Sequence, residues 1–270
     1  MLKKRVIFTL LYSSGSFMLS RNFRLQKVGG LGWLKKNYNF SNISFSIDEL
    51  IILDVTRGEK DEKRFHEHVR SLASECFAPI AAGGGIRTLE HARNLLYSGA
   101  DKVVVNTLIY ESTDIMNEII SEFGQQSVVA SVDVKMVDNK FTVWTDNGSV
   151  LQKKSVTQWL EDIALLGVGE LYLNSIDRDG TGQGYQIELL DSIPDTFSIP
   201  VILSGGAGKY DHLSNGLRDK RIDAVATEHL FNFVGDGLKK MRNKLLEEGH
   251  NLPYWDAEIV RKMYNTLHTG

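Results

Sequence analysis

Apolar, β-branched runs recur along the chain, with helical patterns between them. The runs are apolar without alternation, which is typical of strands buried on both faces of a parallel sheet. The predicted strands are residues 5–11, 49–55, 80–82, 102–105, 127–134, 170–173, 200–203 and 224–227. The predicted helices are residues 60–75, 88–98, 112–123, 156–166, 187–192, 209–219 and 238–248. Eight strand–helix units in 270 residues predict an α/β fold, a single (β/α)8 TIM barrel, with a doubly wound open sheet as the alternative.

The chain also resembles itself at a shift of about half its length. Residues 82–86 match 204–208 and residues 101–107 match 223–229, both at a shift of about 122. Two four-stranded half-barrels explain such a two-fold repeat, whereas an open sheet gives no reason for it. We therefore predict a barrel over residues 1–250 and a C-terminal tail over 251–270, which either docks on a partner or packs as a terminus.

Composition and charge exclude several classes of protein. The chain is 42% hydrophobic and has a net charge of −3, which gives no basic bias toward nucleic acid. Its single cysteine, Cys76, excludes a disulfide framework and suits the cytoplasm, where we expect the protein. No apolar run approaches the roughly 18 residues of a membrane span. The apolar run at residues 6–12 is short and no small-residue cleavage site follows, so we interpret it as a strand and not a signal peptide.

Glycine-rich loops follow the third and the seventh predicted strands. Residues 83–85 form the first loop and Gly205 and Gly206 the second, at corresponding places in the repeat. Glycine lets backbone N–H groups approach a phosphate closely, and such loops meet at the C-terminal face of an α/β barrel. We interpret the two loops as sites for a small phosphorylated molecule, although tight strand–helix turns also use glycine.

Five motifs carry a resemblance to a known family: SIDRDGT at 175–181, GGGI at 83–86, SGGAGK at 204–209, GADK at 99–102 and LD at 53–54. Together they resemble the cyclase subunit of imidazole glycerol phosphate synthase, from about residue 4 to residue 246. That family is a (β/α)8 barrel that takes ammonia from a glutaminase partner through its lumen. In a lyase-type reaction it splits and cyclises a ribulosyl-phosphate nucleotide. The resemblance implies no cofactor or metal, and phosphate or substrate binding at Gly84, Gly85, Asn106, Thr107, Asp179, Gly180, Gly205 and Gly206.

The chain departs from this family at its catalytic pair. The family uses two aspartates, at the ends of strands one and five, and Asp133 matches the second. The matching position on strand one holds Leu11, and Leu19 stands where the family has a lysine. Loss of a general acid or base typically costs roughly 10²–10⁴-fold in rate. We therefore expect little cyclase activity.

The second glycine loop departs from the family as well. Glu228 and His229 stand where the family has small residues. We expect Glu228 to repel a phosphate there, unless a protonated His229 compensates. His229 can equally be a histidine of the rim with no such role.

The opposite end of the barrel keeps the family pattern. Arg5, Glu49, Lys102 and Glu170 begin strands one, two, four and six and match the charged ring that forms the family's ammonia gate. Asp101 matches the surface that faces the glutaminase, so we predict a partner interface there. Charges at strand starts can also be simply solvated, but four matches favour a retained gate.

Three functions remain open from the sequence. The first is an ammonia-channelling subunit of a glutamine amidotransferase complex, a divergent paralogue that accepts ammonia from a glutaminase. By resemblance it would deliver this ammonia, with a separate amidotransferase or ligase subunit, to acetamidino groups of nucleotide sugars for lipopolysaccharide. The second is a genuine cyclase subunit of histidine biosynthesis. The third is a non-catalytic scaffold for the glutaminase.

Overall fold

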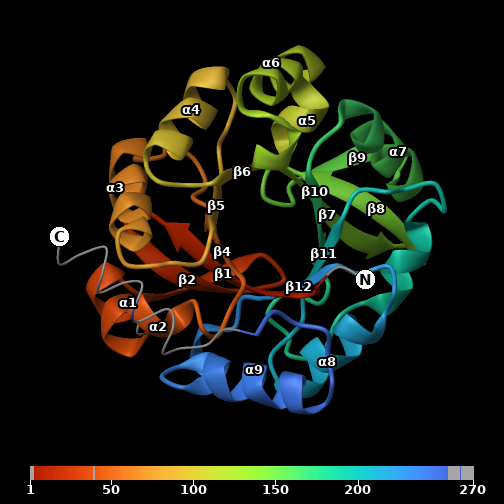
Figure 1. Cartoon of the computed structure of the whole chain (residues 1–270). Coiled ribbons are helices and arrows are strands. Elements are labelled where there is room, and N and C mark those ends of the chain that lie inside the picture. The colour runs from red at the N-terminus through yellow and green to blue at the C-terminus, as the bar shows by residue number, and fades with distance from the viewer. Residues whose placement is uncertain (1–2, 39, 255–261, 263–270) are drawn as a thin grey trace.

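The computed structural model describes residues 3–38, 40–254 and 262. Within this part, eight parallel strands form a closed barrel (Figure 1). They are β1 (Arg5–Ser13), β4 (Glu49–Asp54), β5 (Ile80–Gly83), β6 (Lys102–Val105), β7 (Val128–Val137), β10 (Glu170–Ser175), β11 (Val201–Ser204) and β12 (Ala224–Thr227). The barrel closes because β12 pairs with β1 and β7 pairs with β10. The predicted (β/α)8 barrel is confirmed, and the open sheet is excluded.

Helices surround the barrel on its outside (Figure 1). They are α1 (Leu31–Asn37), α2 (Phe40–Ile43), α3 (Glu62–Ala73), α4 (Leu89–Tyr97), α5 (Thr107–Glu111), α6 (Thr113–Phe123), α7 (Val156–Leu166), α8 (Tyr210–Arg218) and α9 (Gly237–Glu247). Polar side chains fix their starts: Ser155 and Gln158 form a capping box on α7, and Ser112 accepts the Ile115 N–H on α6. The predicted helix at 187–192 is a 3₁₀ helix, η2 (Ile187–Ser192), as are η1 (Gln125–Ser127) and η3 (Leu230–Phe233).

Two β-hairpins extend from the barrel and were not predicted. The first is β2 (Ser16–Arg21) with β3 (Arg24–Gly29), and the second is β8 (Lys140–Thr145) with β9 (Val150–Ser155). The first hairpin turns at Asn22 and Phe23, with φ of 51° and 62°. Two consecutive left-handed residues match the twist of the flanking strands.

Apolar side chains form two layers on either side of the barrel wall. The outer layer lies between strands and helices and includes Phe8, Leu10, Leu50 and Leu160. The inner layer fills the lumen with Ile7, Ile51, Ala81, Val104, Val129, Tyr172, Ile202, Ala224 and Ala226. Successive strand residues alternate between these layers, so Arg5, Ile7, Thr9 and Leu11 of β1 all face the lumen.

The two halves of the barrel repeat the same local contacts. Asp101 accepts the Ile80 N–H at 2.8 Å, and Asp223 accepts the Val201 N–H at 2.9 Å. The register extends the match to the mouth: Leu11 pairs with Leu53 as Asp133 pairs with Asn174. Leu11 is therefore the structural counterpart of Asp133.

The described start of the tail packs against the barrel. The Asn251 carbonyl accepts the Lys4 N–H at 2.8 Å, and Leu252 is buried. The buried Arg242 guanidinium donates to the Pro253 carbonyl. Residues 255–261 and 263–270 of the predicted tail lie outside the described part. No helix in the described part of the chain is long and apolar enough to cross a membrane.

Candidate functional site

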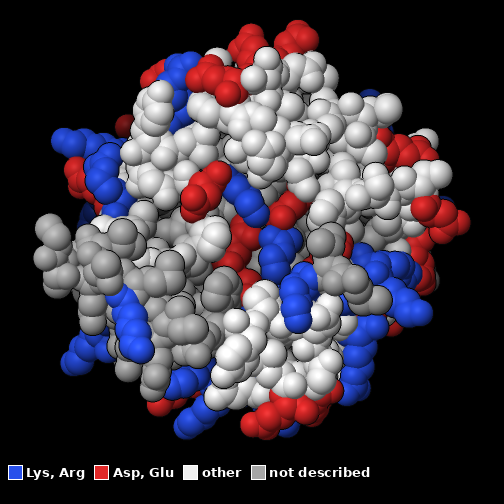
Figure 2. Space-filling view, viewed as in Figure 1, with Lys and Arg blue, Asp and Glu red and all other residues white. Residues whose placement is uncertain are grey.

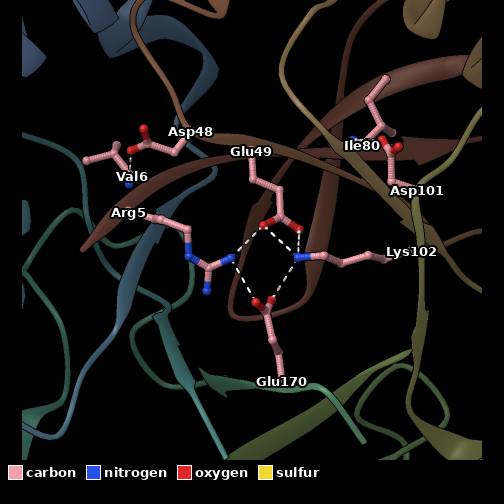
Figure 3. Close-up of polar contacts among 8 residues, drawn as sticks. All are labelled: Arg5, Val6, Asp48, Glu49, Ile80, Asp101, Lys102 and Glu170. Atoms are coloured by element: carbon pink, nitrogen blue, oxygen red, sulfur yellow. Dashed lines mark hydrogen bonds and ion pairs between the residues drawn. The ribbon is translucent and has the colours of Figure 1, made fainter. Parts of the chain in front are cut away.

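Four charged side chains close the barrel floor in a ring of ion pairs (Figure 3). Arg5 Nη1 lies 2.8 Å from Glu49 Oε2 and 2.8 Å from Glu170 Oε1. Lys102 Nζ lies 3.1 Å from Glu49 and 3.2 Å from Glu170. Each cation thus bridges both anions, and the ring neutralises its own charge where the lumen begins. The four residues predicted as an ammonia gate are brought together in one closed cluster.

Figure 2 shows the face on which this ring lies. Acidic and basic side chains meet in the hollow at its centre. Asp101, predicted as an interface residue, is exposed on the same side at the start of β6. Its carboxylate also caps the start of β5 through the Ile80 N–H.

The opposite ends of the strands surround a cavity of about 260 Å³. Its lining includes the predicted residues Leu11, Gly84, Gly85, Asn106, Thr107, Asp133 and Asp179. A neighbouring cavity of about 150 Å³ is lined by Gly180, Gly205 and Gly206, and Glu228 lines both cavities. The residues predicted for the mouth therefore gather at the C-terminal ends of the strands.

Asp133 is one of the carboxylates that line the larger cavity. Its two oxygens accept Asn106 Nδ2 at 2.9 Å and Asn174 Nδ2 at 3.0 Å. Burial raises the pKa of Asp133 to about 7, with a further contribution from the charge of Asp179, while the two amide hydrogen bonds act in the opposite direction. Asp133 can thus accept or donate a proton near neutral pH, but its counterpart Leu11 cannot.

The glycine loops have backbones that only glycine adopts readily. Gly84 has φ of 109°, and a Cβ built there would lie 2.2 Å from the Asp54 carbonyl oxygen. Gly206 has φ of 103°, and its Cβ would lie 2.2 Å from the Gly184 carbonyl oxygen. The glycines are thus required by the turns themselves. Phosphate binding by these loops stays a prediction.

Asp179 and Gly180 hold the first hairpin over the mouth. Asp179 accepts Ser20 Oγ at 2.5 Å and the Phe23 N–H at 2.8 Å. A Cβ on Gly180 would lie 1.7 Å from the Ser20 carbonyl oxygen, so the hairpin backbone passes directly over this glycine. The DRDGT motif therefore holds the first hairpin in place at the mouth.

Glu228, expected to face a phosphate at the second glycine loop, lines the smaller cavity with Gly205 and Gly206 and also forms hydrogen bonds within the barrel. Its Oε1 accepts hydrogen bonds from the Tyr172 hydroxyl at 2.9 Å and from Ser204 Oγ at 3.2 Å. The carboxyl group is therefore directed toward the lumen, where Tyr172 lies. Burial and the charge of Asp179 raise the pKa of Glu228 to about 8. Burial lowers the pKa of His229, so at pH 7 neither the repelling anion nor the compensating cation is favoured.

The chain matches the family described as "Histidine biosynthesis protein" over residues 40–233. It is 46% identical over 244 residues to a protein of Parasynechococcus marenigrum named "Putative imidazole glycerol phosphate synthase subunit hisF2", covering 90% of this chain and 91% of that one. It is 36% identical to the imidazole glycerol phosphate synthase subunit HisF of Chlorobaculum tepidum and 37% identical to that of Sulfurisphaera tokodaii. Each of these two matches covers 92% of this chain and 98% of the relative. The chain belongs to the HisF-like cyclase family.

In this HisF-like barrel, several cations of the mouth were missed by sequence reasoning. Arg57, Lys60 and Arg87 line the larger cavity, and Arg21 and Arg24 line the smaller one. Lys60 lies beside the first glycine loop in the fold, where a Cβ on Gly85 would lie 2.8 Å from Lys60 Cδ, but it precedes Gly85 by 25 residues and no local pattern shows this contact. The two hairpin arginines could not be placed because the hairpin itself was not predicted.

Proposed function

We propose that this HisF-like barrel conducts ammonia from a glutaminase partner to an acceptor other than the family's cyclisation substrate. The observation that carries the proposal is the contrast between the two ends of the lumen. The floor retains a complete ring of Arg5, Glu49, Lys102 and Glu170. The mouth has Leu11 opposite Asp133, where acid–base catalysis of the cyclisation needs a second carboxylate.

The floor face supports docking of a partner subunit. Large apolar side chains are exposed where chain segments return to this end of the barrel: Phe77 before β5, Tyr97 at the end of α4 and Leu165 at the end of α7. Exposed apolar surface beside a charged centre is typical of a protein–protein interface. A glutaminase seated there would release ammonia at the ring.

The acceptor belongs to nucleotide-sugar metabolism in our proposal, with acetamidino groups of lipopolysaccharide as the product. This setting rests on the resemblance to divergent HisF-type subunits that work with a glutaminase and a separate amidotransferase. The cations Arg57, Lys60 and Arg87 around the larger cavity, with the glycine loops, support an anionic or phosphorylated ligand at the mouth.

A second candidate, the histidine-pathway cyclase, has one observation in its favour: Asp133 keeps its amide partners Asn106 and Asn174 in a well-formed cavity. The two candidates predict different complexes. Purification of the tagged chain from its own cell, with the bound proteins identified, should recover a glutaminase together with an amidotransferase or ligase. Recovery of the glutaminase alone, with imidazole product formed at the rate of a HisF measured in parallel, would support the cyclase instead.

A further inference from the structure

Tyr172 closes the lumen at the level where the lumen meets the mouth. Its ring is the largest side chain of the inner apolar layer and is almost fully buried. Its hydroxyl lies 3.3 Å from Thr9 Oγ1 on β1, a strand three positions away from β10 around the barrel. The side chain therefore reaches across the lumen. Because the interior of an eight-stranded barrel is just wide enough for side chains to fill, one tyrosine in this position is sufficient to close it.

Polar groups from three strands hold this ring in place. The Tyr172 hydroxyl lies 2.7 Å from Ser204 Oγ, at the end of β11, and donates to Glu228 Oε1, directly after β12, at 2.9 Å. Thr9 and Ser204 are completely buried. Hydrogen bonds in such a dry environment are stronger than in water, because no solvent competes for the partners. The position of Tyr172 across the lumen is thus fixed by β1, β11 and the residue after β12.

Glu228 connects the tyrosine to the mouth. It lines both mouth cavities, and Tyr172 lines the larger one. Its carboxyl group also forms a hydrogen bond with the carboxyl group of Asp179. Two carboxyl groups can share a hydrogen bond only when one of them keeps its proton. Burial raises the pKa of Glu228 to about 8, so at neutral pH Glu228 donates to Asp179 while it accepts from Tyr172.

Asp179 extends these contacts to the first hairpin, β2–β3. It accepts Ser20 Oγ at 2.5 Å and the Phe23 N–H at 2.8 Å. Phe23 has a φ of 62°, a left-handed conformation that a bulky residue keeps only when its surroundings hold it there. Its ring lies against the second hairpin, since a Cβ on Gly148 would lie 2.7 Å from Phe23 Cδ2. The tip of the first hairpin is therefore held in a strained position over the mouth, and Asp179 is one of the groups that hold it.

We propose that Tyr172 is a gate between the lumen and the mouth, and that Glu228 and Asp179 couple this gate to the hairpin β2–β3. The proposal deepens the proposed conduit function and rests on it. Hydrogen bonds join Tyr172 to Glu228, Glu228 to Asp179 and Asp179 to Phe23, so the closed hairpin and the closed lumen stabilise each other. A molecule that moves the hairpin when it enters the mouth favours release of the tyrosine. Ammonia then leaves the lumen when the mouth is occupied.

The coupling can be tested on the isolated chain by amide hydrogen exchange. Tyr172→Phe keeps the ring and removes only the hydroxyl, although two carboxyl groups separate this residue from the hairpin. Exchange over residues 16–29 should accelerate roughly fivefold, the effect of losing one net hydrogen bond, while the barrel strands stay protected. Tyr185→Phe is the matched control. It removes another buried tyrosine hydroxyl, which donates to the Ala226 carbonyl at 2.8 Å, and should leave the exchange of the hairpin unchanged.

Two substitutions of Glu228 separate the coupling from a general loss of packing. A glutamine can still accept from Tyr172 and donate to Asp179, so Glu228→Gln should keep the exchange rates of the wild-type hairpin. Glu228→Leu forms neither bond and should accelerate exchange at least as much as Tyr172→Phe does. Because coupling is reciprocal, Asp179→Ala should also make the Tyr172 ring flip at least tenfold faster in ¹³C NMR spectra. The exposed Asp195→Ala should not.

Three results would overturn the gate. They are a hairpin exchange in Tyr172→Phe equal to that in Tyr185→Phe, equal effects of Glu228→Gln and Glu228→Leu, and an unchanged rate of ring flips in Asp179→Ala. These measurements need neither glutaminase nor acceptor, so they can fail while the conduit stands. A barrel that shows the coupling but conducts no ammonia from the floor would instead remove the conduit and keep the link between Tyr172 and the hairpin.

Discussion

Residue 11 is where the resemblance predicts the main chemical difference between this barrel and the cyclase family. Leu11 lies opposite Asp133 in the larger cavity and is nearly fully buried, so it forms an apolar wall where a proton-transferring group would stand. Asp133 keeps a pKa near neutrality in the same cavity. The mouth therefore has one member of the predicted acid–base pair, Asp133 on β7, and lacks a carboxylate at the matching position of β1.

A carboxylate placed at residue 11 should restore cyclase activity if Leu11 is what limits the cyclisation. We expect the wild-type chain, given ammonium and the ribulosyl nucleotide, to form imidazole product roughly 10²–10⁴-fold more slowly than a HisF. Leu11→Asp should raise this rate at least about tenfold, and Leu11→Asn, which has the same shape but no titratable group, should not. A wild-type rate equal to that of HisF would contradict the interpretation of Leu11.

Glu228 should make the stability of the barrel depend on pH. Its folded pKa is about 8 and its ordinary value 4.5, so between these values the folded state binds more protons than the unfolded state. Stability is then lost as the pH rises from about 5 to 8, by about 1 kcal/mol per pH unit. Urea unfolding at several pH values should show a shallower decline for Glu228→Gln. Equal slopes for the two proteins would show that Glu228 is already ionised.

At the scale of elements, the hairpin β2–β3 decides what the mouth looks like. It places Ser20, Phe23 and Leu25 over the larger cavity and Arg21 and Arg24 over the smaller one. Asp179 fastens it through two hydrogen bonds. The hairpin is thus the element most able to change the access to the mouth.

Loss of the Asp179 carboxylate should destabilise the hairpin more than the barrel. Asp179→Ala leaves the Phe23 N–H and the Ser20 hydroxyl without their acceptor, which costs about 1–3 kcal/mol. Amide hydrogen exchange should speed up over residues 16–29 while the barrel strands stay protected. The exposed Asp195→Ala serves as the control. Uniformly faster exchange across the barrel strands would mean that Asp179 supports the whole fold instead.

The barrel elements could be predicted from the sequence, because buried parallel strands are continuous apolar runs. Predicted 102–105 and 224–227 coincide with β6 and β12, and predicted 156–166 coincides with α7. The hairpins have no such runs: no residue of β3 is buried, β9 is mostly exposed, and both strands are rich in polar residues. Their only local signal is the chemistry of the turns, Asn22-Phe23 between β2 and β3 and Asp146-Asn147 between β8 and β9, where φ is positive.

The site residues, too, could be predicted only where a local pattern marks them. Glycine loops and strand-end charges were visible because each belongs to a motif or a repeat. The direction of Glu228 was not visible, since it depends on Tyr172, 56 residues away, which reaches across the lumen to meet it. Long-range pairings of this kind follow from the closed barrel and from no local pattern.

At the scale of the whole molecule, the barrel joins two unlike ends through one lumen. The floor is a self-neutralised ring of four charges (Figure 3). The mouth is a cavity lined by cations and glycine loops. Between them the lumen is lined by apolar side chains up to the Tyr172 hydroxyl. An apolar path with a polar port at its entrance suits a small neutral molecule such as ammonia.

The most direct test of the conduit is the ratio of amidated product to glutamate in the complete complex. Lys102→Ala leaves Glu49 and Glu170 against Arg5 alone and should distort the port. Glutamine hydrolysis should persist while glutamine-dependent product falls, and external ammonium should restore the product. The exposed Lys239→Ala should leave the ratio unchanged. A Lys102→Ala complex that stays assembled with the wild-type ratio would contradict the conduit and make the barrel a scaffold.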